Sequence, residues 1–407
     1  EQDSSPVRIR VLNESLIAFR TTSGKVGLIE DTCPHRGASL FFGRSEDEGL
    51  RCLYHGWKFD VTGQCVDMMN EPAESAFKQK IKAVAYPTLE RGGCIWAYLG
   101  PRDTPPPLPE IEANLELEGV SPVSLCLNEY NWLQAMENNL DTAHNVILHH
   151  GAITLEAASD PKFPNAGMKY LVANRAAQFD IRDADFGISS GAHRPAAPGS
   201  TYWRTTLWLW PFYTLSPTFQ MGTRSEVVAT VPVDDHHNMQ VTFNRVLGQR
   251  NGNSRQFGGD STLPNTSDWL GRFRNALDPT TDFGIDRALQ RRAPPDSTGW
   301  SGIRGGVPAQ DEAMKWSQGR ADGDGIVDRS REHLGTTDAM IMRVRQHLLE
   351  AATALRERQA APPCVDSPAL YGQRSGWNLL PEGVDYFEGL RELREGFRAS
   401  VGMVPSR

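Results

Sequence analysis

Two short segments of the chain each place a cysteine close to a histidine. Cys33 and His35 lie in Cys-Pro-His-Arg-Gly, and Cys52 and His55 lie in Cys-Leu-Tyr-His-Gly-Trp. Each segment offers one thiolate and one imidazole, with glycine or proline nearby to form a tight loop. Sixteen residues separate His35 from Cys52, enough for a strand to leave one loop and return beside the other. We therefore expect the four side chains to form one metal site.

Two thiolates and two imidazoles can bind either a single zinc ion or an iron–sulfur cluster. Zinc sites favour C-x₂₋₄-C and H-x₃₋₅-H pairings, whereas here each pair combines a cysteine with a histidine. In a Rieske-type [2Fe–2S] cluster, two cysteines bind one iron and two histidines bind the other, which raises the reduction potential. The pattern therefore favours a [2Fe–2S] cluster over zinc, with Cys33, His35, Cys52 and His55 as ligands.

A second group of metal-binding side chains lies within residues 131–150, where the histidines are His144, His149 and His150. Non-haem iron(II) sites use two histidines and one carboxylate on one side of the metal. On a regular helix, five residues span about 500°, which places His149 roughly 140° away from the face of His144. The helix must therefore end or widen between them, as recurs at functional sites. Spacing alone leaves the choice between His149 and His150 open.

Asp141 lies about one helical turn before His144, so both side chains can face the same way. A carboxylate that accepts an imidazole N–H fixes the tautomer of the histidine and offers a short path for an electron. The alternative is an ordinary aspartate on a helix surface. Pairs of histidines in helices are also most often packing or surface residues, so the cluster motif upstream is what favours a metal site here.

The elements that position these motifs differ between the two halves of the chain. Short runs with turns between them predict an antiparallel meander at 7–12, 16–19 and 25–29, and further strands at 59–63 and 91–99. Residues 100–109 are rich in proline and predict an extended linker. Beyond it, apolar spacing predicts helices within 131–150 and 338–355 and strands at 201–210, 226–233 and 240–246.

We therefore predict an α+β protein with two domains. Residues 1–105 are expected to form an antiparallel β domain with the cluster. Residues 106–407 are expected to form an α+β domain, with an antiparallel sheet flanked by helices and a mononuclear metal site. Segments rich in glycine and serine at 249–261 and 321–325 predict mobile loops.

Composition narrows the class of protein. A net charge of −8 and the lack of a Lys/Arg run argue against a nucleic-acid binder. No apolar stretch reaches the roughly 18–20 residues that span a bilayer, and the start lacks signal-peptide features. We therefore expect a cytoplasmic protein, and the absence of an initiator Met suggests that the printed residues begin inside a longer chain. The cysteines outside the two loops have no nearby ligand partner and are expected to be buried or incidental thiols: Cys65, Cys94, Cys126 and Cys364.

Residues 31–43 and 50–59 resemble the Rieske domains of ring-hydroxylating oxygenases, and Asp141, His144 and His149 match their D-x₂-H-x₄-H motif. The resemblance implies a mononuclear Fe(II) bound by His144 and His149, with His150 as a neighbour. It implies that Asp141 is a catalytic residue that bridges an iron histidine and a cluster histidine of a neighbouring subunit. It also points to Asp311 as the carboxylate ligand, with Glu312 as the adjacent alternative.

Residues 328–338 and the long C-terminal region resemble the phthalate dioxygenase branch of that family. The resemblance implies a homotrimer or stacked trimers that hydroxylate an aromatic carboxylate with O₂. Electrons would come from a separate NADH-dependent reductase with flavin and a [2Fe–2S] centre, in agreement with the lack of a Gly-x-Gly-x-x-Gly motif here. They would then cross from the cluster of one subunit to the iron of the next, because the linker is expected to hold the two metals of one chain far apart.

An apolar pocket with a convergent cation would suit such a substrate. Asn145, directly after the first iron histidine, and Arg204, in an aromatic strand, are the candidate substrate-binding residues.

Two alternatives to the proposed dioxygenation remain. The reaction could be a monooxygenation such as O-demethylation, which gives a phenol and formaldehyde instead of a cis-diol. The chain could also be an electron carrier without the third iron, which iron counting and oxygen uptake would test.

Overall fold

The computed structural model describes residues 2–72, 74–115, 123–163, 165–247, 262–292, 297–319 and 325–396. The predicted loop at 249–261 lies outside the described residues, as does 321–324 of the second predicted loop. The chain divides into two compact units. Unit 1 contains Glu1–Pro106, Pro232–Asp234 and Leu263–Arg274, and unit 2 contains Pro107–Val231, Asp235–Thr262 and Asn275–Arg407.

Unit 1 consists of small antiparallel sheets, as predicted. β1, β2 and β3 form the expected meander, β4 to β7 form a four-stranded sheet, and β8 pairs with β9. Their bounds are Val7–Val11, Glu14–Arg20, Val26–Glu30, Arg44–Glu46, Gly49–Arg51, Trp57–Asp60, Cys65–Met68, Thr88–Arg91 and Cys94–Ala97, with 3-10 helices η1 at Leu40–Phe42 and η2 at Phe77–Lys80. The two-residue turn between β1 and β2 has positive φ at Leu12 and Asn13, as tight hairpins require.

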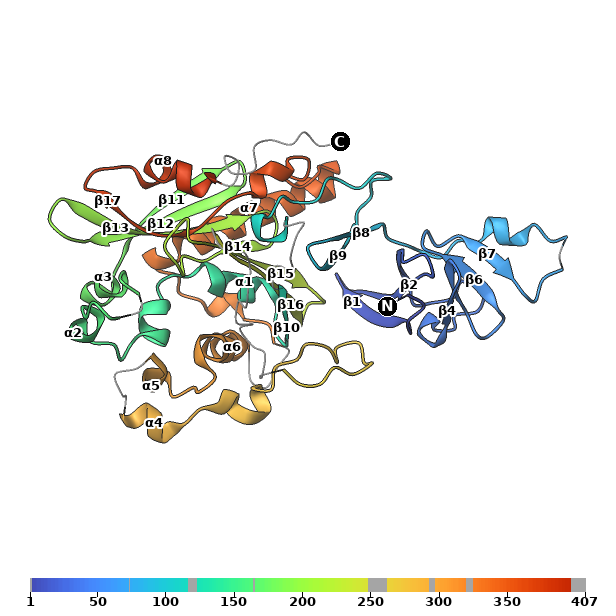
Figure 1. Ribbon diagram of the computed structural model, residues 1–407, viewed down its shortest axis with the longest axis horizontal. Helices are drawn as coiled ribbons and strands as arrows, with labels where there is room; N and C mark the ends of the chain where they lie inside the picture. The colour runs from blue at the N-terminus through green and yellow to red at the C-terminus, as the bar shows by residue number, and fades with distance from the viewer. Residues whose placement is uncertain are drawn as a thin grey trace. The chain divides into compact units, whose positions relative to one another are not determined.

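Unit 2 contains an eight-stranded sheet (Figure 1) with the order β10-β16-β15-β14-β13-β12-β11, and β17 pairs with β13. The strand bounds are Val123–Asn128 for β10, Gln178–Ala184 for β11, Gly187–Pro195 for β12, Ser200–Leu209 for β13, Tyr213–Leu215 for β14, Arg224–Pro232 for β15, Asn238–Val246 for β16 and Gly376–Pro381 for β17. The pairs are antiparallel. This confirms the predicted α+β class and the antiparallel sheet.

The helices that matter for the site are α1 at Trp132–Leu140, the π-helix η4 at Asn145–His149, α6 at Gly306–Gln318 and α7 at Ala339–Arg358. The shorter ones are α2 at Leu155–Ala158, α3 at Met168–Ala173, α4 at Arg287–Arg292, α5 at Ser297–Ser301, α8 at Tyr386–Gly389 and α9 at Arg391–Arg394. The 3-10 helices of this unit are η3 at Glu112–Asn114, η5 at Pro279–Gly284, η6 at Arg329–Arg331, η7 at Thr336–Asp338 and η8 at Pro368–Tyr371. Among the described residues, no helix is both long and apolar enough to cross a membrane.

One face of the large sheet holds α1 and α7. Met136 of α1 and Val344 of α7 pack with Ile188 and Trp208 of neighbouring strands in one buried cluster. Side chains alternate along a strand, so the even-numbered residues of β13, from Tyr202 to Trp208, share this face. The apolar spacing of α7 was predicted correctly for its first turns, although Leu355 near its end is exposed.

Candidate metal centres

The two cysteine–histidine loops of unit 1 have the same backbone fold. In the first, the Cys33 N–H donates to the Ala38 carbonyl and the Cys33 carbonyl accepts from the Gly37 N–H, at 2.8 and 2.9 Å. In the second, Cys52 makes the same two bonds with Trp57 and Gly56, at 2.8 and 3.0 Å. Each glycine has φ near +75°, a conformation that other residues rarely adopt. The different Cys–His spacings are thus accommodated by one type of turn.

The loops bring the four predicted cluster ligands together. Cys33 and Cys52 are buried, and the rings of His35 and His55 lie 4.4 Å apart between centroids. Burial, together with the nearby Cys52 thiol, raises the pKa of Cys33 to about 11 although backbone N–H groups of His35 and Arg36 oppose this. A thiolate at this buried position therefore needs a cation beside it. The donor set of two thiolates and two imidazoles fits a [2Fe–2S] cluster.

The side-chain positions also weigh against a single zinc ion. Tetrahedral zinc at 2.0–2.3 Å from each ligand requires the four donor atoms to converge on one point. Among the described residues, one group of three metal-binding side chains has its ligand atoms within 4.8 Å of one another. This group is His144, His149 and Asp311. The cysteine–histidine loops do not form such a group, as expected when two ligand pairs bind two different irons.

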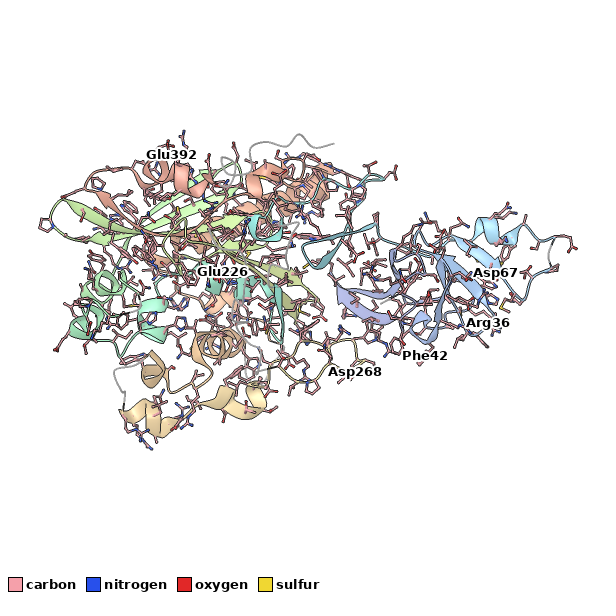
Figure 2. The ribbon with its side chains drawn as sticks, viewed as in Figure 1. Arg36, Phe42, Asp67, Glu226, Asp268 and Glu392 are labelled. Carbon is pink, nitrogen blue, oxygen red and sulfur yellow. The ribbon has the colours of Figure 1, made fainter. Side chains whose placement is uncertain are left out.

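Aromatic rings surround the histidine end of this site. His35 stacks on Trp57 with 4.3 Å between centroids, and Tyr54 lies 3.9 Å from His55. Arg36 lies at the outer edge of the unit (Figure 2), with its guanidinium 5.7 Å from the Tyr54 ring. Partial burial, with His35 and Arg36 nearby, lowers the pKa of His55. Both the partial burial and the nearby positive charge favour the neutral imidazole that a metal ligand requires.

In unit 2 the backbone changes form between the candidate iron ligands, which confirms the prediction from their spacing. α1 ends at Leu140, Asp141 is its C-cap, and His144 precedes the π-helix that runs from Asn145 to His149. Arg175 supports this segment because its guanidinium donates to the carbonyl of Val146 at 2.6 Å. The wider turn rotates His149 toward His144, so that their rings lie 5.1 Å apart between centroids.

Asp311, from α6, completes the group. Its Oδ1 atom lies 3.4 Å from His144 Nε2 and 3.2 Å from His149 Nε2. Oδ1 is buried and accepts no hydrogen bond within the described residues. Although burial opposes ionisation, positive charge and N–H donors facing Asp311, which the two imidazoles provide when their Nε2 atoms carry hydrogen, hold its pKa well below its usual range. An ionised, buried oxygen facing two ring nitrogens is the environment that a divalent cation requires.

The far sides of both imidazoles have hydrogen-bond acceptors. His144 Nδ1 lies 3.2 Å from Asp141 Oδ2, and His149 Nδ1 lies 2.7 Å from Gln310 Oε1. If each Nδ1 carries the hydrogen, both Nε2 lone pairs point at Asp311. Three electron-rich atoms then converge, and a cation between them would be bound by all three. The site therefore fits an iron(II) ion held by two histidines and one carboxylate.

The competing ligand candidates lie elsewhere. Glu312 faces away from the group, where Oε2 accepts from the Tyr130 hydroxyl at 2.5 Å and Oε1 pairs with Lys315 at 2.8 Å. His150 is outside the converging group, and burial together with the nearby His149 lowers its pKa to about 4. The geometry thus supports His149 over His150 and Asp311 over Glu312. Gln310 was not predicted, because an amide in a helix has no spacing signal of its own.

The two predicted substrate residues contact each other. Arg204 Nη1 donates to Asn145 Oδ1 at 3.1 Å. Arg204 is 5% exposed, and burial lowers the pKa of its guanidinium. Among the described residues no carboxylate pairs with Arg204, although buried arginines normally pair with an anion. This buried guanidinium therefore contacts the residue that follows His144 and, within the described part of the chain, pairs with no carboxylate.

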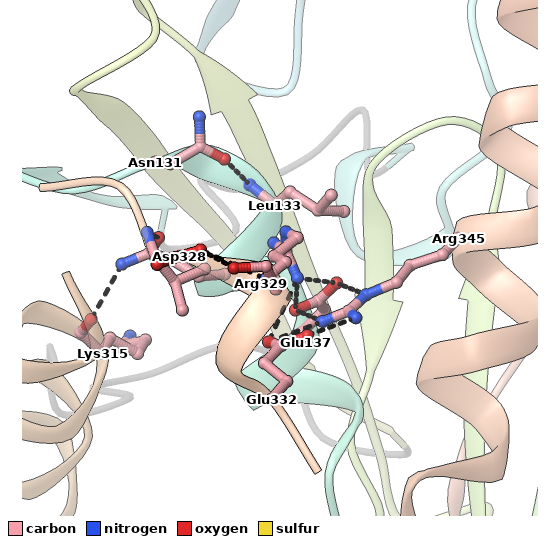
Figure 3. A network of polar contacts seen from close by, with 11 residues as sticks. Asn131, Leu133, Glu137, Lys315, Asp328, Arg329, Glu332 and Arg345 are labelled. Carbon is pink, nitrogen blue, oxygen red and sulfur yellow. Dashed lines mark hydrogen bonds and ion pairs between the residues drawn. The ribbon is translucent and has the colours of Figure 1, made fainter. Parts of the chain in front are cut away.

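A buried ion network fixes α1, which holds Asp141 at its end (Figure 3). Glu137 accepts from Arg345 Nε and Nη2 at 2.6 and 2.8 Å, and from Arg329 Nη1 at 2.9 Å. Arg345 also pairs with Glu332 at 2.6 Å. Arg329 and Glu332 belong to the segment 328–338, which resembles the phthalate dioxygenase branch. Its charged residues thus connect α1 to α7.

We expect Glu137→Gln to lower the free energy of unfolding by about 2 kcal/mol, because Arg345 and Arg329 lose the buried carboxylate that they share and keep only Glu332 as a partner. Thermal and denaturant unfolding of the full chain measure the loss. The control is Arg343→Gln on α7, close to Arg345 in the chain, which breaks an exposed pair with Asp183 and should cost less than about 1 kcal/mol. Equal losses in both variants would contradict a special role for Glu137.

The same network predicts a pH dependence. The hydrogen bond with Arg345 lowers the pKa of Glu332 below its usual value of 4.5. A lowered carboxyl pKa stabilises the fold above the unfolded pKa, and this contribution is lost as the pH falls through the folded pKa. Glu332→Gln should therefore be less stable than the parent chain at pH 7. The difference should shrink on acidification below about pH 4.5.

The comparisons with known proteins agree with this geometry. Residues 1–85 match the Rieske [2Fe-2S] domain model, and residues 97–369 match the model described as LigXa C-terminal domain like. The 3-chlorobenzoate-3,4-dioxygenase oxygenase subunit of Comamonas testosteroni is 37% identical over 97% of this chain and 91% of its own length. The phthalate 4,5-dioxygenase oxygenase subunit of Pseudomonas putida is 33% identical over 89% of this chain and 80% of its own length.

A solved structure shows the same fold. Dicamba monooxygenase bound to dicamba has a TM-score of 0.54 at 18% identity, over 88% of this chain and 95% of that one. At this identity the likeness concerns the fold alone, whereas the two sequence relatives and the model that matches two thirds of the chain show the family. The chain therefore belongs to the Rieske non-haem iron ring-hydroxylating oxygenases, as an oxygenase subunit of the phthalate dioxygenase branch.

Proposed function

We propose that the protein hydroxylates an aromatic carboxylate, of the phthalate, isophthalate or substituted benzoate type, with O₂. The observation that carries the proposal is Arg204, a buried cation without a carboxylate partner among the described residues, which contacts Asn145, the residue directly after His144. Two oxygenase subunits that are similar over most of the chain act on 3-chlorobenzoate and phthalate by name. Both compounds combine an aromatic ring with a carboxylate.

As a Rieske oxygenase the protein uses a [2Fe–2S] cluster and a mononuclear iron. The cluster supplies single electrons, and the mononuclear iron supplies the position at which O₂ is activated. We assign the cluster to Cys33, His35, Cys52 and His55 in a domain of residues 1–105. We assign the mononuclear iron to His144, His149 and Asp311 in a catalytic domain of residues 106–407.

Asp141 is proposed to connect the two centres across a subunit boundary. Its Oδ2 atom faces His144 Nδ1 at 3.2 Å, while Oδ1 accepts from the Ala143 N–H at 2.6 Å. About a quarter of its side chain stays exposed in the single chain, so the carboxylate can accept a further hydrogen bond from a cluster histidine of a neighbouring subunit. This role requires a homotrimer or stacked trimers.

The oxygenase subunit takes electrons from a separate partner protein. We propose an NADH-dependent reductase with flavin and a [2Fe–2S] centre as that partner. The exposed apolar side chains beside the cluster histidines, Leu53 and Tyr54, are suited to contact with a protein.

In the substrate site, Arg204 is proposed to bind the carboxylate and Asn145 to hold the guanidinium in place. A charge-assisted hydrogen bond to a buried guanidinium orients the ring as well as binding it. Asn145 follows His144 directly, so the anchored ring would lie close to the iron ligands. The hydrogen bond at 3.1 Å between Arg204 and Asn145 is the contact that couples orientation to the metal site.

We expect Arg204→Met to raise the KM for an aromatic carboxylate by about 10–100-fold, since a hydrogen bond to a charged group contributes about 1.5–3 kcal/mol. Steady-state kinetics with the carboxylate and with its uncharged amide measure the effect. The KM for the amide should change little. Arg182→Met is the control, because that arginine lies on β11 of the same sheet but already pairs with two carboxylates, Asp180 and Asp385. An unchanged KM in Arg204→Met would contradict the proposal that Arg204 binds the substrate carboxylate.

Product analysis tests the proposed reaction. The purified chain, a surrogate reductase and a panel of aromatic mono- and dicarboxylates should give a cis-dihydrodiol with consumption of O₂. A phenol with formaldehyde from a methoxybenzoate would instead support monooxygenation by O-demethylation, in line with the 5,5'-dehydrodivanillate O-demethylase subunit of Sphingobium, which is 32% identical over 57% of this chain. Absence of both products across the panel would contradict the proposed substrate class.

A further inference from the structure

Gln310 lies immediately before Asp311 on α6, and its side chain is 1% exposed. Its Oε1 atom lies 2.7 Å from Nδ1 of His149, which is also 1% exposed. Consecutive residues of one helix therefore contact both nitrogens of the same imidazole, because Asp311 Oδ1 lies 3.2 Å from its Nε2. The ring of His149 is held at both ends by the segment that provides the carboxylate.

We propose that Gln310 is the positioning residue that fixes the tautomer and orientation of His149. An amide oxygen only accepts hydrogen bonds, so the bond to Gln310 requires the hydrogen of His149 on Nδ1. The Nε2 lone pair is then directed toward Asp311. The inference rests on the proposed function, in which His149 and Asp311 bind iron, and it deepens the account of that site.

The two histidines have different partners on their far sides. His144 faces the carboxylate of Asp141, whereas His149 faces the neutral amide of Gln310. A carboxylate partner adds negative charge and makes an imidazole a stronger ligand, whereas an amide orients the ring without adding charge. With Asp311 and Asp141 as the two negative groups at the site, a divalent ion is balanced in charge. A third carboxylate would shift this balance toward the trivalent ion.

Iron(II) affinity is the readout, because a residue that only fills space would not change it. The mononuclear site of the full chain, with its cluster intact, is emptied with a chelator and titrated anaerobically with Fe(II) against a colorimetric competitor. We expect Gln310→Leu, of similar size but without an acceptor, to weaken Fe(II) binding by about 10–100-fold. Gln318→Leu, the same substitution at an exposed position of α6, should leave the affinity unchanged.

Gln310→Glu separates positioning from folding. Glutamate keeps the length and the acceptor, so Fe(II) affinity should return to at least the parent value, and the Fe(III)/Fe(II) potential should fall because of the added charge. An unchanged affinity in Gln310→Leu, or a loss in Gln310→Glu as large as in Gln310→Leu, would overturn the inference. If the parent chain itself bound no Fe(II) beyond the cluster, the proposed iron site would be wrong, which is a distinguishable result.

Discussion

Replacing Asp311 with asparagine should empty the mononuclear iron site and leave the cluster intact. Asparagine has nearly the same shape but offers a neutral oxygen in place of the ionised Oδ1 that faces both imidazoles. Changes to residues that only orient ligands already weaken metal binding by about 10–100-fold, so loss of the one charged ligand should exceed about 100-fold. Iron content should fall from about three atoms per chain to about two, which is the content of the cluster.

Iron analysis and the visible spectrum of the cluster measure this result together. Product formation should disappear along with the third iron, whereas the cluster should still accept an electron. An Asp311→Asn chain that kept the third iron would contradict the ligand assignment.

The comparison with Glu312 makes the test specific. Glu312 is buried and paired with Lys315, so removing its charge alone would leave a lone buried cation and endanger the fold. The double variant Glu312→Gln/Lys315→Met removes both charges and avoids this cost. It should retain the third iron. Loss of iron in this folded double variant, with retention in Asp311→Asn, would identify Glu312 as the ligand instead.

How far the sequence predicts the sites depends on how local each one is. The cluster loops are local, because cysteine, histidine and glycine lie within six residues and dictate one type of turn. The π-helix was also predictable, since His144 and His149 cannot share a face of a regular helix. Asp311 was different. It lies 162 positions from His149 and 167 from His144, and only the family resemblance singled it out.

The contacts that support the candidate iron site could not be predicted from the sequence for the same reason. Gln310 is an ordinary amide until folding places it beside His149, and Glu137 meets Arg345 across 208 positions of the chain. Short strands were missed as well. β14 has three residues, and β17 joins the sheet by pairing with β13, far earlier in the chain. Pairing with a distant strand leaves no periodic signal in so short a segment.

Asp141→Asn should leave both metal centres in place and lower coupled product formation by about 100-fold or more, because the charge that orients His144 and connects it to a cluster is lost. Asparagine keeps one oxygen, which should accept from His144 Nδ1 so that the iron stays bound, while the Ala143 N–H loses its acceptor. Metal analysis, the reduced cluster spectrum and single-turnover product yield measure the outcome. Asp160→Asn is the matched control, since Asp160 makes the same type of turn with the Lys162 N–H at 2.8 Å but lies at an exposed position. Activity equal to that of the parent chain would refute the bridge.

Mixed oligomers test the direction of the electron across the subunit boundary. A chain with Asp141→Asn has an intact cluster and a broken bridge, whereas a chain with Cys52→Ser has an intact bridge and no functional cluster. Each should be inactive alone. If electrons pass between subunits, coexpression with two affinity tags should yield mixed oligomers with partial activity, because some interfaces place an intact cluster beside an intact Asp141. If electrons pass within one chain, neither chain contains a complete route and mixing should restore nothing. Restored activity therefore requires transfer between subunits, and its absence in verified mixed oligomers would refute that transfer.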